Sequence, residues 1–456
     1  MKSSTPEKVT LIGAGLNGPL LAILLMQRGF AVEIYERRPD MRQVSVSAGR
    51  SINLALSTRG IHALQQAGMW EQMRNIIIPM RGRMMHSVAG ELTFQRYGKN
   101  ETEVINSISR AGLNIALMNA AEEQGAILHF HQRCTGYDLR SGELRIRNEE
   151  TSEEKLLSTK TVIGCDGSAS ALRGEMLKLS RFNFSQSYLD YGYKELTIPA
   201  ASNGKHLLEA NALHIWPRGN YMLIALPNID GTFACILFLP FEGTDSFASL
   251  ASDSDVVNFF EERFPDALRL MPQLAENYAA NPTGAMVTIK CSPWHVDGKA
   301  LLLGDAAHAI VPFFGQGINC GFEDCTHLVE LLDRYGADWA RVFSEFEQER
   351  RVNTDAIADM AIENFTEMRD RVADSKFLFR KKVELALEAK YPQLFVPKYS
   401  MVTFHRIPYS VALARGTVQD RLLNELCERV DRLEDLDWGK AERMIRHDLT
   451  PLESSQ

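Results

Sequence analysis

The chain has 456 residues, of which 45% are hydrophobic and 24% are charged, as expected for a globular protein of two or three domains. The net charge of -8 argues against nucleic acid as a partner and against a polybasic membrane contact. The seven cysteines are an odd number without a CxxC spacing, so neither a disulfide framework nor a metal site is predicted.

The N-terminus leads from a few polar residues straight into a strand-like segment, which leaves no room for a signal peptide. No apolar run approaches the roughly 18 residues that span a bilayer. We therefore expect a soluble cytoplasmic protein with no membrane partner.

Residues 9–36 have the order of a nucleotide-binding unit. Gly13 allows a tight turn after a buried strand, Gly15 lets a pyrophosphate approach the backbone, and Gly18 lets the next helix pack closely. Glu36 ends the following strand, where a carboxylate binds ribose hydroxyls and repels a 2′-phosphate. FAD or NAD is therefore expected here, and NADP is not. The predicted elements are strand 9–12, helix 16–28 and strand 31–35.

Further along the chain, segments of helical and strand-like periodicity alternate, which is typical of a parallel sheet covered by helices. Four strand-like segments joined by short turns interrupt this order and predict an inserted antiparallel sheet. Residues from 339 onward predict long helices. The expected helices are 60–77, 110–124 and 318–334, the expected strands of the parallel sheet are 126–130, 161–165 and 300–303, and those of the inserted sheet are 193–198, 212–216, 221–226 and 232–239.

Two acidic residues follow predicted strands, which is where ligands bind in doubly wound sheets. Asp166 and Asp305 can each hold ribose or ribityl hydroxyls, although Asp166 could belong to a surface turn and Asp305 could cap a helix. The helix after Gly317 and Ile318 offers its N-terminal N–H groups to a developing anion, such as the pyrimidine edge of a reduced flavin.

The segments 13–18, 165–167 and 304–305 together resemble the single-component FAD-dependent aromatic hydroxylases. Further stretches resemble the kynurenine-hydroxylating branch of that family, and its bacterial members in particular, because the eukaryotic ones carry a C-terminal membrane segment. These stretches are 49–55, 80–84, 211–217, 312–319 and 398–404.

The resemblance implies an α/β fold like that of p-hydroxybenzoate hydroxylase. A Rossmann-like FAD domain (1–73, 101–180 and 291–335) contains an inserted antiparallel-sheet substrate domain (74–100 and 181–290). A C-terminal helical region (336–456) follows.

The resemblance also implies a substrate site for the amino-acid end of L-kynurenine, with an apolar wall around its ring. For the polar residues, surface or loop positions remain alternatives, and for the apolar residues an ordinary core position does. The implied polar residues are Arg83, Tyr97, Asn364 and Tyr399, and the apolar ones are Phe313, Phe238, Leu213, Met222 and Met368. The expected FAD-binding residues are Gly13, Gly15, Leu16, Gly18, Glu36, Arg37, Arg38, Ala55, Arg110, Asp166, Asp305, Gly317 and Ile318.

The implied reaction is hydroxylation of L-kynurenine to 3-hydroxykynurenine by NADPH and O₂ through a flavin C4a-hydroperoxide, as part of tryptophan degradation. No residue is assigned as catalytic acid or base, and His308 is expected to orient or pack. The alternatives are a related hydroxylase of another aromatic compound and a flavin-binding protein without oxygenase activity. A homodimer is left open.

Overall fold

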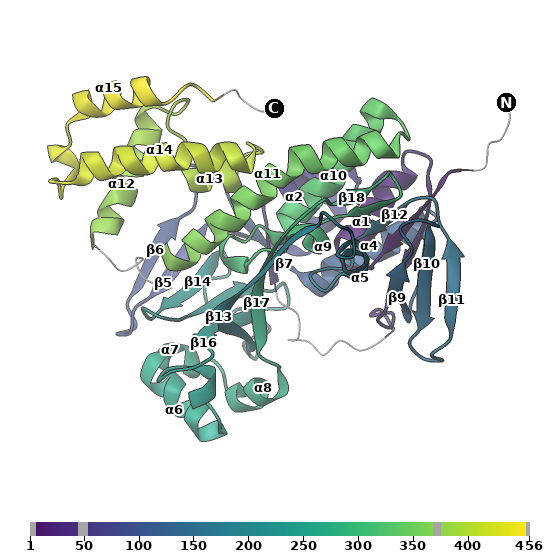
Figure 1. The fold of residues 1–456 in the computed structure, drawn as a ribbon. Coiled ribbons are helices and arrows are strands. Elements are labelled where there is room, and N and C mark those ends of the chain that lie inside the picture. Colours follow the sequence, from purple (N-terminus) through teal and green to yellow (C-terminus); the bar gives the residue numbers. More distant parts are fainter. Residues whose placement is uncertain (1–5, 44–52, 368–374, 453–456) are drawn as a thin grey trace. The chain divides into compact units, whose positions relative to one another are not determined.

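The computed structural model describes residues 6–43, 53–367 and 375–452. Within them the chain, drawn as a ribbon in Figure 1, divides by its internal contacts into two compact units, and each unit is built from three separate stretches. The first unit comprises residues 1–77, 107–189 and 285–358, and the second comprises residues 78–106, 190–284 and 359–456. The division into a FAD-binding domain, a substrate domain and a C-terminal region stays a prediction.

The first unit is organised around a six-stranded sheet in the order β18-β19-β12-β1-β2-β8. All neighbouring strands are parallel except β18, which pairs with β19 in the antiparallel sense. β1 lies between β12 and β2, so the sheet has a switch point at the carboxyl end of β1, where doubly wound sheets bind ligands. The strands are β1 (Lys8–Ile12), β2 (Ala31–Tyr35), β8 (Ile127–His129), β12 (Val162–Gly164), β18 (His295–Val296) and β19 (Ala300–Leu302).

Helices pack against this sheet through one hydrophobic core. α1 is buried along almost its whole length, and α11 begins in the first unit and continues along the chain into the second. The helices are α1 (Asn17–Met26), α2 (Thr58–Gln66), α3 (Trp70–Met73), α4 (Arg110–Glu123), α5 (Ala171–Met176), α9 (Asp305–His308), α10 (Gly317–Tyr335) and α11 (Trp339–Thr366).

One expectation for this unit was wrong, and one of its sheets was not predicted. The helix over 60–77 is broken, because Gly68 adopts the left-handed conformation with φ of 73° and the chain turns there. A three-stranded antiparallel sheet was also missed, because β11 is almost wholly exposed and shows no alternation of apolar residues. Its strands are β9 (Gln132–Tyr137), β10 (Glu143–Asn148) and β11 (Glu154–Ser158).

Several further strands complete the chain order. β3 (Asn53–Leu56) pairs with β7 (Ile105–Ser109), and η2 (Pro312–Phe314) is a short 3₁₀ helix before α10. β4 (Ile77–Met80) and β17 (Gly284–Ser292) lie where the chain passes from one unit to the other.

The second unit contains the expected antiparallel sheet, with strands in the order β13-β16-β15-β14-β5-β6. The four predicted strands are confirmed, and β5 adds to them in the parallel sense beside β14. β6 then pairs with β5 and is exposed along most of its length. The strands are β13 (Asn183–Ile198), β14 (Ala212–Pro217), β15 (Met222–Pro227), β16 (Phe233–Pro240), β5 (Gly82–His86) and β6 (Leu92–Arg96).

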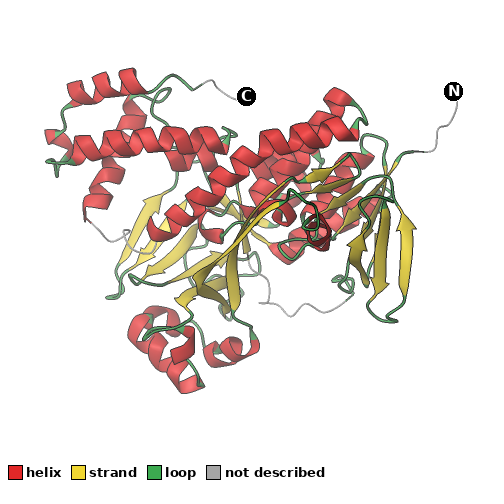
Figure 2. Ribbon diagram, in the orientation of Figure 1, coloured by secondary structure: helices red, strands yellow, loops and turns green. Residues whose placement is uncertain are grey.

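One face of this sheet packs against three short helices that the sequence pattern did not reveal (Figure 2). Trp216, Leu223 and Leu237 point to this face and meet Phe260 and Phe264 of the helical segment. Because side chains alternate along a strand, the intervening residues point to the opposite face. The helical elements are η1 (Phe247–Ser249), α6 (Asp253–Arg263), α7 (Pro265–Leu268) and α8 (Leu274–Ala280).

The C-terminal part of the second unit is helical, as predicted, and has its own hydrophobic core around Phe395, Leu422 and Ile445. Its elements are α12 (Ser375–Lys390), α13 (Lys398–Thr403), α14 (Tyr409–Cys427), η4 (Leu433–Asp435) and α15 (Trp438–Asp448). Among the described residues, no helix is long and apolar enough to cross a membrane.

The glycine turn gives a first test of this packing. A Cβ atom on Gly18 would lie 2.1 Å from the Gly13 carbonyl oxygen, so we expect Gly18→Ala to lower the free energy of unfolding by about 1–3 kcal/mol. Gly112→Ala in α4 is the control, because its Cβ would meet only ordinary contacts from 3.6 Å. That variant should be as stable as the parent or slightly more so. Denaturant unfolding measures both, and a Gly18→Ala protein of unchanged stability would contradict the close packing.

Candidate flavin site and substrate site

The turn after β1 has three glycines with different surroundings. Gly13 has φ of 99°, and a Cβ on it would lie 2.6 Å from the Cys165 carbonyl oxygen. A Cβ on Gly15 would instead meet no atom within 4 Å. Packing therefore demands glycine at 13 and 18, whereas Gly15 faces open space of the kind a diphosphate needs.

The N-terminus of α1 also suits a diphosphate. Leu16 is the residue before the helix, and no described side chain caps the first N–H groups. These groups and the helix dipole favour an anion. The fit of the turn and the helix to the pyrophosphate of FAD is therefore good.

Glu36 lies buried at the end of β2, as the sequence pattern predicts. Its carboxylate accepts hydrogen bonds from the Ala14 N–H at 2.8 Å and from the Arg38 side chain at 2.8 Å. Burial alone would raise the pKa of Glu36, but the hydrogen bonds and charge of Arg38 lower it, so the group is ionised. Arg37 is exposed, and Arg38 is engaged with Glu36.

Asp166 follows β12 at the same sheet edge. Its Oδ2 accepts a hydrogen bond from the Ala171 N–H at 2.8 Å, while its Oδ1 is buried and has no partner in the part of the chain that the structure describes. Burial raises the pKa of this carboxyl. An unpartnered buried oxygen beside the Gly13 turn is unlike a solvated surface turn, and it fits an acceptor for a cofactor hydroxyl.

Asp305 begins α9, and its side chain is accessible. The protein atoms packed around the carboxyl displace part of its hydration, which raises the pKa of Asp305, while the charges of Arg110 and His308 lower it. Gly304 precedes the helix, and no side chain caps it, so the alternative that Asp305 caps a helix is wrong. The structure thus brings Arg110 and Asp305 into the same electrostatic environment.

The N-terminus of α10 lies against β3. The Asn319 side chain donates to the Ala55 and Gly315 carbonyl oxygens at 2.8 Å each and accepts from the Ser57 N–H at 2.8 Å. A Cβ on Gly317 would meet nothing within 4 Å, so the start of this helix is open to a ligand. Ile318 beside it is partly buried.

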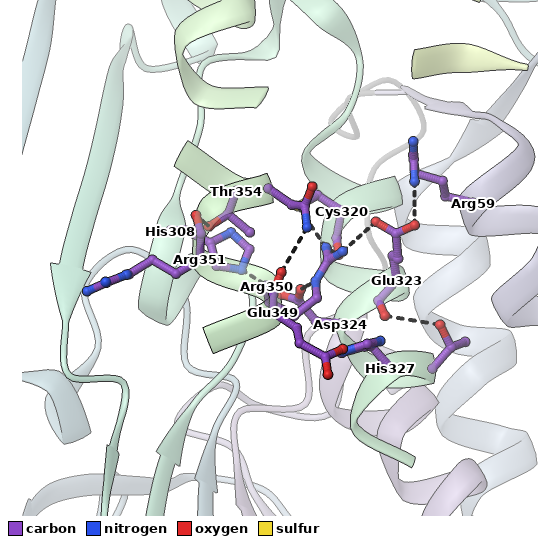
Figure 3. A network of polar contacts seen from close by, with 12 residues as sticks. Arg59, His308, Cys320, Glu323, Asp324, His327, Glu349, Arg350, Arg351 and Thr354 are labelled. Atoms are coloured by element: carbon purple, nitrogen blue, oxygen red, sulfur yellow. Dashed lines mark hydrogen bonds and ion pairs between the residues drawn. The ribbon is translucent and has the colours of Figure 1, made fainter. Parts of the chain in front are cut away.

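A buried network of charges supports these turns, and the sequence pattern did not predict it (Figure 3). Asp324 Oδ2 accepts from the Gly304 N–H at 3.2 Å and lies 2.6 Å from His308 Nε2. Arg350 donates to Asp324 Oδ1 at 2.7 Å and to Glu323 Oε2 at 2.6 Å, and Arg59 pairs with the same Glu323. The network therefore joins α2, α9, α10 and α11.

The opposite charges of the network stabilise one another's ionised forms. Burial would raise the pKa of Asp324, but His308 and Arg350 lower it. Burial would lower the pKa of His308, but the Asp324 carboxylate raises it well above its usual value. His308, Cys320 and Asp324 are side chains of the kind that bind metals, yet the Arg350 guanidinium already contacts Asp324 and Cys320.

A signal for this network was present in the sequence. Asp324 shares a helix face with Cys320, Leu328 and Leu331, which are all buried. An acid in such a position needs a buried partner of opposite charge. Asn17 was missed as well: a Cβ on Gly304 or on Gly321 would collide with its side chain, at 2.1 and 2.5 Å.

The second unit brings three of the expected substrate residues together. The Arg83 guanidinium carbon lies 5.5 Å from the ring centre of Tyr97 and 5.1 Å from that of Tyr399. The two rings are nearly parallel, with centres 5.9 Å apart. Arg83 Nε is buried and has no hydrogen-bond partner among the described residues, and Glu367 also acts on the Arg83 charge. Burial raises the pKa of Tyr97, so its phenol stays neutral.

The apolar residues expected beside them lie on one side of the sheet. The register pairs Leu213 with Arg83 and Met222 with Phe238, and Met222 in turn lies opposite Pro217, an even step from Leu213. All four side chains therefore point to the face that is not covered by α6 to α8.

The other expected residues are placed as follows. Asn364 is buried on α11 in the second unit, and Phe313 is buried in the first unit. Met368 lies outside the described residues. Glu367 was not anticipated, although it stands one helical turn after Asn364.

The fold is that of FAD-dependent oxygenases. It is similar to 2-methyl-3-hydroxypyridine-5-carboxylic acid oxygenase, with a TM-score of 0.67 and 19% identity over 82% of this chain and 96% of that one. It is also similar to PqsL of Pseudomonas aeruginosa, a probable FAD-dependent monooxygenase, with a TM-score of 0.64 and 17% identity over 82% and 99%. Residues 7–360 match the family model of the FAD binding domain.

Relatives at higher identity cover the full length. The chain is 52% identical to kynurenine 3-monooxygenase of Myxococcus xanthus over 99% of this chain and 97% of that protein. It is 47% identical to the protein of the same name from Xanthomonas campestris (strain 8004), over 99% of both. The chain belongs to the kynurenine 3-monooxygenase family.

Because the space beside Gly15 is open, a substitution there should change FAD affinity without changing the stability of the cofactor-free protein. Gly15→Ala should leave the unfolding of the cofactor-free protein unchanged and weaken FAD binding by about 1–3 kcal/mol, because the added methyl group fills the space for the diphosphate. Flavin fluorescence titration measures the affinity. Gly174→Ala in α5 is the control, since its Cβ also meets nothing within 4 Å. Equal FAD affinities for both variants would remove Gly15 from the site.

The buried network predicts a large cost for losing one charge. Asp324→Asn should lower the free energy of unfolding by about 3–5 kcal/mol, because it leaves Arg350 and His308 incompletely paired. Asp333→Asn on the same helix removes an exposed partner of Arg28 and should cost at most about 1 kcal/mol.

The pH dependence of the free energy of unfolding, compared between the parent protein and Asp324→Asn, provides a check. The Asp324 pKa is lowered by folding, so its contribution is present above about pH 4 and is lost as the pH falls through the folded-state value. Equal destabilisation by the two substitutions would contradict the role of the network.

Proposed function

We propose that this protein hydroxylates L-kynurenine to 3-hydroxykynurenine with FAD, NADPH and O₂, as a step of tryptophan degradation. The observation that carries the proposal is identity of about one half to kynurenine 3-monooxygenases over nearly the whole chain. The grouping of Arg83, Tyr97 and Tyr399 supports it independently, because it suits the charged end of an amino acid.

FAD is expected to lie at the carboxyl edge of the first unit's sheet. The diphosphate would lie at Gly13, Gly15, Leu16 and Gly18, with a ribose on Glu36. Asp166, Asp305 and Arg110 are proposed for the ribityl and flavin parts, and Ala55, Gly317 and Ile318 for the flavin edge. Arg37 and Arg38 would flank the adenosine. Bound there, FAD would supply the redox and oxygen chemistry, with NADPH as the reductant and O₂ as the source of the transferred oxygen.

The protein's own part is to bind and orient the substrate. Arg83 offers a planar fork to the α-carboxylate, and its unpartnered Nε is one donor for it. Tyr97, whose phenol stays neutral, is one hydrogen-bond donor beside Arg83, and the Tyr399 hydroxyl is another. Asn364 is proposed to add an amide. Glu367 supplies a negative charge beside Arg83, which suits the α-ammonium group of the same substrate.

The aromatic end is proposed to meet an apolar wall that excludes water, formed by Leu213, Met222 and Phe238 on the sheet. For Phe313 and Met368 a role beside the substrate is proposed from the resemblance alone. An aniline ring is already activated toward an electrophilic oxygen, so no protein acid or base is assigned. His308 is accounted for by its pairing with Asp324.

The direct test is product formation. The purified protein should carry FAD, and with L-kynurenine, NADPH and O₂ it should form 3-hydroxykynurenine, detected by mass spectrometry. p-Hydroxybenzoate and other phenols should give no hydroxylated product. Turnover of a phenol alone would favour a related hydroxylase, and flavin binding without any turnover would favour a protein that has lost oxygenation.

Arg83 provides the residue-level test. Arg83→Ala should weaken L-kynurenine binding by about 2–3 kcal/mol, which is roughly 30- to 150-fold in Kd, because a charge-assisted contact is lost. Arg81→Ala is the control, since Arg81 lies just before β5, is exposed and pairs loosely with Glu101 at 3.7 Å. Titration of the FAD-loaded protein gives both affinities. Unchanged binding by Arg83→Ala would exclude this residue from the site.

A further inference from the structure

A chain of hydrogen-bonding groups crosses the second unit on the sheet face opposite Arg83. Asp266 Oδ2 lies 2.8 Å from His86 Nδ1, and His86 Nε2 lies 2.8 Å from His214 Nδ1. His214 Nε2 lies 2.9 Å from the Glu209 carbonyl oxygen. Both histidines are only 2% exposed, and none of these groups has a role in the proposed chemistry.

The two groups at the ends of this row of hydrogen bonds, the Glu209 carbonyl oxygen and the Asp266 carboxylate, determine which ring nitrogens of His214 and His86 carry a hydrogen. The Glu209 carbonyl oxygen can only accept, so His214 Nε2 carries a hydrogen. Burial lowers the pKa of His214 to about 4, so this ring is neutral and its Nδ1 is an acceptor. His86 Nε2 must therefore donate to His214. Burial alone would raise the pKa of Asp266, but His86 and Trp216 lower it, so this carboxylate is ionised and accepts from His86 Nδ1.

Both ring nitrogens of His86 then carry hydrogens, which makes the ring an imidazolium. Its surroundings suit a cation: the Trp216 indole stacks on it with ring centres 3.9 Å apart and planes inclined by 25°. The Trp216 Nε1–H also donates to Asp266 at 2.8 Å.

Other charges face this group. Arg218 donates to the His86 carbonyl oxygen at 3.0 Å, and the Glu209 carboxylate acts on His214. Arg218 also interacts with Asp266, so the carboxylate has two cationic neighbours.

The position of His86 connects it to the substrate site. His86 and Arg83 lie on the same five-residue strand, β5, and point to opposite faces. His214 stands next to Leu213 on β14, the strand that pairs with β5. The contact between His86 and His214 therefore ties the two strands together on the face opposite Arg83 and Leu213, and Asp266 anchors them to α7.

We propose that His86 is a positioning residue: by donating from both ring nitrogens, to Asp266 and to His214, it holds the β5–β14 pair so that Arg83 presents its guanidinium to the substrate carboxylate. This role rests on the proposed function of Arg83. The charge state of His86 does not, and it can be measured without substrate.

The first experiment reads the protonation state. The FAD-loaded protein is labelled with ¹⁵N-histidine, and long-range ¹H–¹⁵N spectra are recorded at pH 7–8, with His86→Gln used for assignment. We expect two protonated ring nitrogens for His86 and one for His214, at Nε2. Asp266→Asn should remove the second proton from His86. A neutral His86 ring in the unaltered protein overturns the proposal, whether or not kynurenine is the substrate.

The second experiment reads the positioning role. His86→Gln should raise the KM for L-kynurenine about tenfold, the size expected for coupling between residues that share one strand contact. The kcat and the flavin spectrum should stay close to those of the parent protein. His206→Gln is the matched control, because His206 is a half-buried histidine of the same unit whose ring contacts the Asn228 carbonyl oxygen and Phe233.

The outcomes separate the two proposals. Absence of turnover in the parent protein would contradict the proposed function and leave the spectra to decide the charge of His86. An unchanged KM in a folded His86→Gln protein, or an equal loss in His206→Gln, overturns the positioning role. If His86→Gln fails to fold, Asp266→Asn carries the same kinetic comparison, since its side chain is partly exposed.

Discussion

The arrangement of the first unit depends on one buried carboxylate. Asp324 is inaccessible to solvent, and it accepts from the Gly304 N–H, from His308 and from Arg350. These three partners stand at the start of α9, at its end and on α11, so a single side chain fixes the segment that carries Asp305. A carboxylate without partners in this position would cost several kcal/mol. The network is therefore required for the structure of the turn at Gly304 and Asp305. It affects cofactor binding only by fixing that turn.

Glycine recurs around the proposed flavin site for two different reasons. Gly13, Gly18 and Gly304 are needed because any Cβ would collide with backbone or with Asn17. A Cβ on Gly15 or on Gly317 would meet no protein atom within 4 Å, so the space beside these two residues is available to a ligand. Substitutions of the first kind act on folding and those of the second kind act on a ligand. Spacing in the sequence does not distinguish them, because both kinds occur in the same turn.

The sequence allowed good predictions where local periodicity and function coincide. The β1 turn, Glu36, the end of α4 at Gly125 and the hairpins from 212 to 240 all follow from patterns within a few residues. The elements that were missed lack such a pattern. β11 is exposed along almost its whole length, and the segment 60–77, expected as one helix, is interrupted at Gly68. The pairing of Arg59 with Glu323 joins residues 264 positions apart, so no local signal could specify it. The roles of the site residues came from resemblance, and the structure adds that Arg83, Tyr97 and Tyr399 are neighbours.

Strand alternation gives the second unit two chemically different faces from one set of strands. Arg83, Leu213, Met222 and Phe238 occupy one face, while His86, His214 and Trp216 occupy the other and meet α6 to α8. A well-packed apolar reverse face would give equal or greater stability, because buried ion pairs rarely repay their desolvation. The polar groups on the reverse face add geometric specificity, because the hydrogen bonds of His86 can form in only one register between β5 and β14. A slip of one residue would turn Arg83 away from Tyr97 and would also break the chain from Asp266 to Glu209. A buried ionic contact behind a recognition strand thus makes the orientation of the binding residue a condition of folding.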